Sequence, residues 1–256
     1  MSSMNLYLLY SLTKRDLESR YKSSSLGALW ILISPLILLA IYSFVFGFVF
    51  KSKWNGHENN YALVMFSGLL VHLFFADCIS RATTVIQNNA NYVKKVNFPL
   101  EILCMVVVAS SLFQFLVSMM VFFIFYFLSG FSFSFGLFQT FILIFPMILL
   151  GYGIVLFLSS LGVYIRDMAH AISLVISIML FMSPVFYPMS AVPEEYRDFL
   201  YFNPSTFIIE ELRMLSLSHA VIDWSNYIIY FLVAIILVAI SKKIFSKLKV
   251  GFSDVL

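Results

Sequence analysis

The chain has 256 residues, of which 61% are hydrophobic and 11% charged; its formal net charge is +3 and its mean hydropathy is +0.95. A soluble domain of this length could not cover so much apolar surface with so few polar side chains, which excludes the soluble fold classes. The composition predicts an integral membrane protein, and no nucleic-acid partner is expected.

The first patterned stretch, residues 5–22, reads as an amphipathic helix. Its i, i+4 pairs Lys14/Glu18 and Asp16/Arg20 each add ~0.3 kcal/mol of helix stability. Because an uncharged apolar run begins at residue 26, we expect this helix to lie on the membrane surface. A surface helix of a soluble domain is the alternative. The side chains that recur on its apolar face are Leu6, Leu9, Tyr10, Thr13, Leu17 and Tyr21.

Stretches with few or no charges then predict six transmembrane helices. The charge-free region 102–165 would extend ~96 Å as one helix, so it must fold back, and the turn-prone cluster 129–136 marks the place. No signal-peptide cleavage site follows the first apolar run, so this span is expected to remain in the mature protein. The predicted fold is an all-α integral membrane domain over residues 1–256, with spans at about 26–50, 61–80, 102–128, 135–165, 171–187 and 224–240.

An even number of spans places both termini on one side of the membrane, and the basic residues indicate which side. Of the sixteen Lys and Arg residues, all but four fall on the side of the termini. The positive-inside rule therefore predicts cytoplasmic termini. The four exceptions are Lys51, Lys53, Arg197 and Arg213.

Two polar segments connect the spans. Residues 87–101 form a short basic cytoplasmic loop. Residues 189–223 form an acidic, partly apolar outer segment, where short amphipathic helices are expected and Asn203 is a natural N-cap for the second of them. The apolar stripe expected on that second helix consists of Phe207, Ile208, Leu212 and Leu215.

Catalytic and metal-binding motifs are missing from the sequence. There is no GxxxxGK[ST] loop to hold nucleotide phosphates and no HExxH motif, and no Ser/His/Asp set shares a membrane depth. Cys78 and Cys104 lie in or beside apolar runs and are interpreted as packing residues. A protein of this kind either takes its energy from a partner or forms a passive assembly.

Few charged side chains fall inside the spans, and no internal repeat or pair of broken helices is found, which argues against an ion-driven transporter. Asp77 and Arg81, four residues apart, favour a structural ion pair over a proton relay. His72 and Gln114 lie deeper, and each is interpreted as an interhelical hydrogen-bonding residue rather than a ligand contact.

Four stretches, in this order and spacing, resemble the membrane subunits of ABC exporters that carry polysaccharides, the O-antigen, capsule and teichoic-acid permeases. They are RDLESRYKSSSLGALWILISP (15–35), YVKKVNFPLEIL (92–103), RDMAHAISLVISIMLFMSPVFYP (166–188) and YFNPSTFIIEELR (201–213). Ser24 departs from a glycine that is common in the turn before the first span, and Cys104 lies near a common proline.

The resemblance implies a half-transporter of the bacterial inner membrane. Two copies of this chain would pair with two separate ATPase subunits that hold ATP and Mg, so the chain itself needs no cofactor and is no enzyme. Helix 5–22 would be an interfacial elbow, loop 87–101 the coupling element and segment 189–223 part of the outer gate. The implied cargo is a polysaccharide such as O-antigen on a polyprenyl diphosphate lipid.

Three sets of candidate residues follow. The residues that would couple to the ATPase are Tyr92, Lys94, Lys95, Asn97, Phe98, Pro99, Arg166 and Asp167. The basic residues that could pair with a lipid diphosphate are Arg15, Arg20 and Lys22. The aromatic residues that could line a glycan path are Tyr42, Phe46, Phe181, Phe186 and Tyr187.

Simpler accounts of these residues remain open. Membrane orientation or contact with anionic lipid explains the basic residues equally well or better, and most Phe side chains in spans face lipid. Two rival functions also remain, an ABC exporter of drugs or small lipids with the same architecture and a membrane-embedded glycosyl- or acyltransferase.

Overall fold

The fold is seen in a computed structural model, which describes residues 3–22, 24–45, 61–94, 98–165, 167–218 and 220–256. Within these ranges all regular secondary structure is helical, which confirms the predicted all-α class. The α-helices are α1 (Ser3–Tyr21), α2 (Trp30–Tyr42), α3 (Tyr61–Ala82), α4 (Ala90–Val93), α5 (Glu101–Leu128), α6 (Phe135–Gln139), α7 (Ile144–Gly162), α8 (Met168–Phe181), α9 (Glu194–Leu200), α10 (Thr206–Leu217), α11 (Trp224–Leu248) and α12 (Phe252–Val255). The 3₁₀ helices are η1 (Gly27–Leu29), η3 (Gln87–Asn89), η4 (Thr140–Leu143), η5 (Met189–Ala191) and η6 (Lys249–Gly251).

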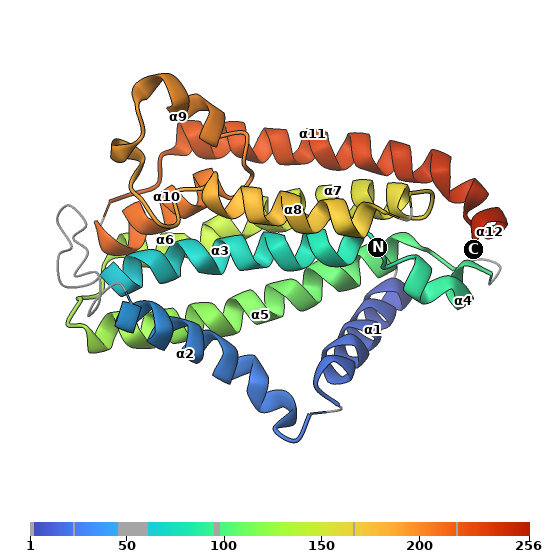
Figure 1. The fold of residues 1–256 in the computed structure, drawn as a ribbon, viewed down its shortest axis with the longest axis horizontal. Coiled ribbons are helices and arrows are strands. Elements are labelled where there is room, and N and C mark those ends of the chain that lie inside the picture. The colour runs from blue at the N-terminus through green and yellow to red at the C-terminus, as the bar shows by residue number, and fades with distance from the viewer. Residues whose placement is uncertain (1–2, 23, 46–60, 95–97, 166, 219) are drawn as a thin grey trace.

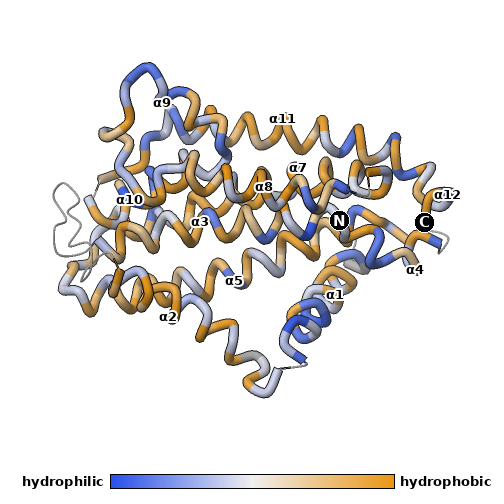
Figure 2. The backbone as a smooth tube through the Cα atoms, in the orientation of Figure 1, coloured by the Kyte–Doolittle hydropathy of each residue, from blue (hydrophilic) through white to orange (hydrophobic). Residues whose placement is uncertain are grey.

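Among the described residues, four helical stretches are long and apolar enough to cross a membrane: Tyr61–Ala82, Glu101–Leu128, Phe135–Gly162 and Trp224–Val255. Two shorter apolar helices, Trp30–Val45 and Met168–Phe181, fall in the other two expected spans. Figure 2 shows the apolar character of the long helices and the more polar character of α1. The exact number of six crossings stays a prediction.

Helix α3 lies at the centre of the bundle. It packs against α5, α7, α8 and α10, and 78% of its most apolar window is buried, compared with 17% for α11, which packs mainly on α7. Figure 1 shows α3, α5, α7, α8 and α11 running side by side, while α1 and α2 diverge from them in a V. The core therefore surrounds α3, and α11 leaves most of its surface to the surroundings.

The predicted fold-back at 129–136 is present. Gly130 adopts a φ of 85°, which favours glycine, and the Ser134 hydroxyl caps α6 by accepting the Leu137 N–H at 3.2 Å. The stretch after this turn is not one regular α-helix, because η4 separates α6 from α7.

Two helices end at positions that differ from the expected span ends. Helix α8 stops at Phe181, because Pro184 and Pro188 follow and proline cannot continue the backbone hydrogen bonding of a helix. The apolar pattern ends at 240, before the lysines of the last turns, whereas helix α11 continues through these lysines to Leu248. Hydropathy marks the apolar length of a helix and not its end.

The beginning of α1 and the C-terminal helix α12 lie toward the same end of the bundle as α4, as Figure 1 shows. The outer segment 189–223, with α9 and α10, lies at the opposite end. The two ends therefore carry the two polar segments that the sequence singles out.

Cys78 and Cys104 are buried free thiols, as expected, and Cys104 lies 3.2 Å from the Ser159 hydroxyl.

Candidate functional site

The segment at residues 87–93 is fastened to the ends of α3 and α7. The Gln87 side-chain amide donates a hydrogen bond of 2.6 Å to the Gly162 carbonyl. At Gly162 the backbones approach so closely that a Cβ atom would lie 2.1 Å from the Thr83 carbonyl oxygen, so only glycine fits there. A displacement of this segment would therefore be passed directly to two helices of the bundle.

Tyr92 and Phe98 stack on each other, with ring centroids 4.6 Å apart and an interplanar angle of 31°. Both rings are half-buried against a small apolar cluster that includes Leu12 of α1 and Ile102 of α5. The Arg15 guanidinium of α1 donates to the Tyr92 hydroxyl at 2.9 Å and lies 5.7 Å from the ring centroid. The two rings therefore fill the angle between α1 and α5 and are only partly exposed.

The other coupling candidates are more exposed or lie outside the described residues. Lys94 and Asp167 are exposed and Pro99 is half-buried. Three further candidates, Lys95, Asn97 and Arg166, fall outside the described ranges, as does Phe46 of the glycan set.

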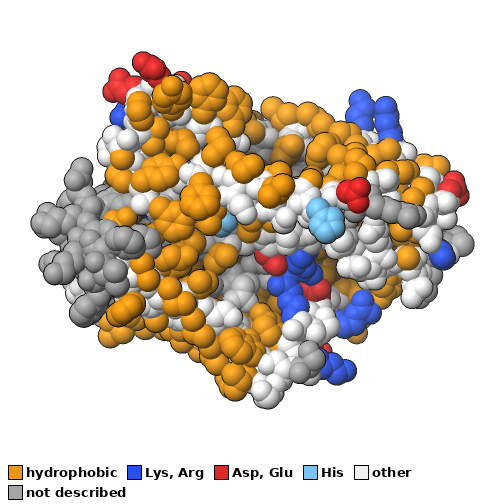
Figure 3. Space-filling model, in the orientation of Figure 1, with side chains coloured by type: hydrophobic (Ala, Val, Ile, Leu, Met, Phe, Trp, Pro, Cys, Tyr) orange, Lys and Arg blue, Asp and Glu red, His pale blue; other side chains and the backbone are white. Residues whose placement is uncertain are grey.

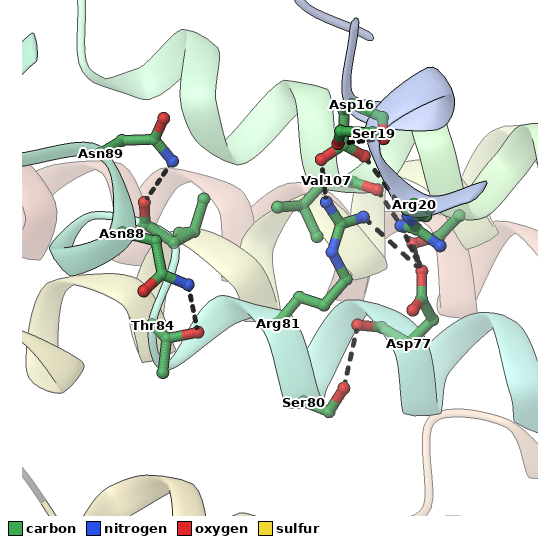
Figure 4. Close-up of polar contacts among 12 residues, drawn as sticks. Asp16, Ser19, Arg20, Asp77, Ser80, Arg81, Thr84, Asn88, Asn89 and Val107 are labelled. Atoms are coloured by element: carbon green, nitrogen blue, oxygen red, sulfur yellow. Dashed lines mark hydrogen bonds and ion pairs between the residues drawn. The ribbon is translucent and has the colours of Figure 1, made fainter. Parts of the chain in front are cut away.

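A network of four charged side chains joins α1 to α3 (Figure 4). Arg20 Nη2 donates to Asp77 Oδ2 at 3.0 Å, and Arg81 Nη2 donates to Asp16 Oδ1 at 2.6 Å. The i, i+4 pairs Asp16/Arg20 and Asp77/Arg81 complete it at 3.5 and 3.7 Å. Ser111 of α5 donates to Asp77 Oδ2 at 2.6 Å. We refer to Asp16, Arg20, Asp77 and Arg81 as the charge network.

The sequence predicts the two i, i+4 pairs but not the ion pairs that link one to the other across α1 and α3. The four side chains are 22–32% exposed, so each pair is partly shielded from solvent. A polar cavity of about 270 Å³ beside the network is lined also by Asn88 and Asn89 of the 87–101 loop. The charge network therefore lies against the same loop as Tyr92.

Gln114 of α5 forms hydrogen bonds with both α1 and α2. It accepts from the Tyr21 hydroxyl at 3.2 Å and donates to the Ile31 carbonyl at 3.0 Å, which confirms the expected interhelical hydrogen bonds. Burial raises the pKa of Tyr21, so its phenol stays a neutral donor. The expected hydrogen bond of His72 is not seen among the described residues: this side chain is 3% exposed in the apolar centre, and its Nδ1 atom has no partner there.

Two local features stabilise the turn between α1 and α2. Gly27 adopts a φ of 51°, and Trp30 Nε1 donates to the Ser24 hydroxyl at 2.8 Å. Beside this turn, a groove of about 830 Å³ between α1, α2 and α5 is lined by Lys14, Glu18 and Lys22 together with hydroxyl-bearing and apolar side chains. Of the three basic residues predicted to meet a lipid diphosphate, Lys22 lines the groove, whereas Arg20 pairs with carboxylates and Arg15 contacts Tyr92.

Four of the five aromatic candidates lie together. The Phe186 ring is 6.3 Å from the Tyr42 ring and 6.2 Å from the Phe181 ring, between centroids. The Tyr187 hydroxyl donates to the Phe181 carbonyl at 2.8 Å. Phe181 is 68% exposed, so this aromatic group, formed by α2, the end of α8 and the loop after it, reaches the surface.

The outer segment is anchored by a charge that the sequence analysis does not single out. Arg213 of α10 is 7% exposed and donates to the carbonyls of Val64, Pro184 and Val185, and it pairs with Glu210 at 3.3 Å. The predicted apolar stripe of α10 is buried as expected. Helix α10 begins at Thr206, and Asn203 forms a turn with Ser205 instead of capping the helix directly.

The described residues contain no group of three or more His, Cys, Asp or Glu side chains that could hold a metal ion. The surface in Figure 3 is largely apolar, with basic side chains gathered near α1 and acidic ones at α9. Apolar helices with polar ends and an anchored connecting loop describe a membrane-embedded helical bundle.

The chain belongs to the ABC-2 type transporter family, whose model matches residues 7–217. With its apolar helices, it is therefore a multi-pass membrane protein and a transport subunit. It is 29% identical over 254 residues to the O-antigen export system permease protein RfbA of Klebsiella pneumoniae, an alignment that covers 97% of this chain and 95% of the relative. A protein of the same name from Myxococcus xanthus is 25% identical, with 96% and 94% covered. The polysialic acid transport protein KpsM of Escherichia coli is 22% identical, with 78% and 77% covered.

Proposed function

We propose that this chain is the permease half of an ABC exporter that moves a lipid-linked polysaccharide, such as O-antigen, across the bacterial inner membrane. The observation that carries the proposal is the end-to-end similarity to relatives named as O-antigen export permeases. Two copies of the chain assemble with two ATPase subunits, which bind ATP and Mg, and both termini face the cytoplasm.

The loop 87–101 receives the movement of the ATPase. Exposed Lys94 and Asp167, with Lys95, Asn97, Pro99 and Arg166, form the docking surface in this proposal. The Tyr92 and Phe98 pair stands behind it and transmits the movement to α1 through the packing of the two rings against Leu12. The Gln87 contact transmits it to α7.

The lipid diphosphate of the cargo binds at the α1 end of the groove between α1 and α2. Lys22 and Lys14 line this groove, and a lysine ammonium pairs with phosphate as a point charge. Lys14 lies 3.9 Å from Glu18 in an exposed pair, which water screens and which a multiply charged phosphate can displace. Arg15 and Arg20 are held by Tyr92 and by carboxylates, so in this proposal they add positive charge near the site without a direct contact.

The glycan passes along the aromatic group of Tyr42, Phe181, Phe186 and Tyr187. Sugar C–H faces pack on aromatic rings, while sugar hydroxyls need only sparse polar partners. Helix α8 adds an exposed apolar face next to this group, with Leu174 67% and Ile178 55% exposed. In the proposal, that face meets the second copy of the chain, and the outer segment 189–223 closes the path at the far end.

The test uses cells in which the chromosomal copy is inactivated and plasmid-borne variants are supplied. Tyr92→Asp should abolish surface polysaccharide and leave polyprenyl-diphosphate-linked glycan in the membrane, because a carboxylate cannot replace the ring stack on Phe98. Surface polysaccharide is measured by immunoblot and the lipid-linked glycan by mass spectrometry. The ATPase should copurify with the wild-type chain.

Tyr92→Phe is the matched control, since it keeps the stacked ring and removes only the hydroxyl that Arg15 contacts. It should export at near wild-type level, and both variants should reach the membrane equally. Export by Tyr92→Asp at wild-type level would remove the coupling role. Absence of lipid-linked glycan in the inactivated strain would remove the proposed cargo.

A further inference from the structure

A second large groove, of about 690 Å³, opens on the side of the bundle between α7, α10 and α11. It shares no lining residue with the aromatic group or with the groove beside α1. It lies along α11, the least buried of the long helices, whose Ile229 and Val233 side chains are 60% and 52% exposed. This side of the bundle is therefore open to membrane lipid.

The inner end of this groove is apolar. It is lined there by Leu150 and Ile154 of α7 and by Val233 and Leu237 of α11. From Asn226 to Leu237 the groove follows α11 for ~16 Å, about half of a ~30 Å hydrocarbon core. Its length and lining match one acyl chain within a single leaflet.

The outer end of the groove is acidic. Glu210, Glu211 and Asn226 line it, beside the stacked rings of Phe207 and Tyr230, whose centroids are 4.7 Å apart. Burial raises the pKa of both glutamates, and a nearby cation would favour their charged forms.

The segment around the outer end of the groove is also negatively charged. Residues 189–223 contain six acidic side chains but only two basic ones, Arg197 and Arg213. Arg213 is occupied by three backbone carbonyls and Glu210. An anionic headgroup would meet a segment of net negative charge here, whereas a cationic group would be attracted and could also contact the aromatic faces.

We propose that this groove binds one phospholipid whose headgroup carries a primary ammonium. The ammonium lies at Glu211 and Glu210, and one acyl chain lies between α7 and α11. Three N–H donors on the ammonium suit two carboxylates and the amide oxygen of Asn226, whose Nδ2 already donates to Asp223 at 2.8 Å. The site is independent of the glycan path and of the ATPase.

The test measures the thermal unfolding midpoint of the full chain, purified in detergent, with added phosphatidylethanolamine or phosphatidylglycerol of identical acyl chains. Phosphatidylethanolamine should raise the midpoint by about 3 °C, and phosphatidylglycerol should not. Glu211→Gln should weaken the apparent affinity for phosphatidylethanolamine about tenfold, because it removes a charge-assisted hydrogen bond. Glu195→Gln, on exposed α9 and outside the groove, is the matched control and should bind as wild type.

A second pair of variants tests the acyl-chain end without changing the core. Val233→Trp fills the groove and should abolish the shift, whereas Ile236→Trp, 57% exposed on the same helix but outside the groove, should keep it. Equal shifts with both lipids, an unchanged affinity in Glu211→Gln, or a retained shift in Val233→Trp would each overturn the proposal.

Discussion

The two ends of the bundle hold their charged side chains in different ways. At the α1 end, two arginines and two aspartates alternate in a network, and each side chain keeps about a quarter of its surface in contact with solvent. At the α10 end, Arg213 is 7% exposed and is held mostly by backbone carbonyls from α3 and from the loop after α8. The first arrangement can exchange partners with water and ions, whereas the second cannot without leaving buried polar atoms unpaired.

This comparison suggests a division of labour between the ends. Ion pairs between separate helices near solvent can open at modest free-energy cost, which suits a junction that moves with α1. A buried guanidinium that bridges three segments fixes them together, which suits the anchored base of the outer segment. The variants below test the difference, from the largest expected effect to the smallest.

Arg213→Met should lower the free energy of unfolding by about 3–5 kcal/mol, because it leaves Glu210 and several carbonyls without a partner. The expected fall in thermal midpoint is about 10 °C in detergent. Arg197→Met is the control, since its side chain is 37% exposed and pairs only with neighbours in the sequence. If both variants unfold at the same temperature, Arg213 does not anchor the outer segment.

The charge network should show a smaller, salt-dependent effect. A double-mutant cycle with Arg20→Ala and Asp77→Ala should give a coupling free energy of about 1–2 kcal/mol, which decreases at high ionic strength because the side chains are partly exposed.

The matched cycle uses Lys14→Ala and Glu18→Ala, a pair that lies on the same helix but is 63% and 64% exposed. Its coupling should stay below about 0.5 kcal/mol. Equal coupling in the two cycles would mean that the network does not fasten α1 to α3.

The smallest effect is expected in the turn before α2. Ser24→Ala removes the acceptor of the Trp30 indole and should cost about 1 kcal/mol, with Trp30→Phe adding little once Ser24 is gone. Ser25→Ala, at the exposed neighbouring position, should leave the midpoint unchanged. A full additive loss in the Ser24 and Trp30 double variant would show that the hydrogen bond contributes nothing.

Sequence patterns predicted the helical class, the fold-back at 129–136 and the stripe of α10, because each depends on local periodicity or turn chemistry. They also predicted that Gln114 bonds between helices. They did not predict the joining of Asp16/Arg20 to Asp77/Arg81, or the burial of Tyr92, because both depend on where α1 rests against α3 and α5. Arg213 was counted only as an outer charge, since nothing local shows that three carbonyls converge on it.

The contact of Gly162 with Thr83 limits how the protein can move. Where two helices touch through backbone atoms, there are no side-chain rotamers to change, so α3 and α7 cannot slide past each other at that point without opening a gap. The pair behaves as one stiff lever, and Gln87 lies at its end. The turn around Gly27 lies outside this lever, so a movement of α1 relative to α2 does not have to disturb the contact of α3 with α7.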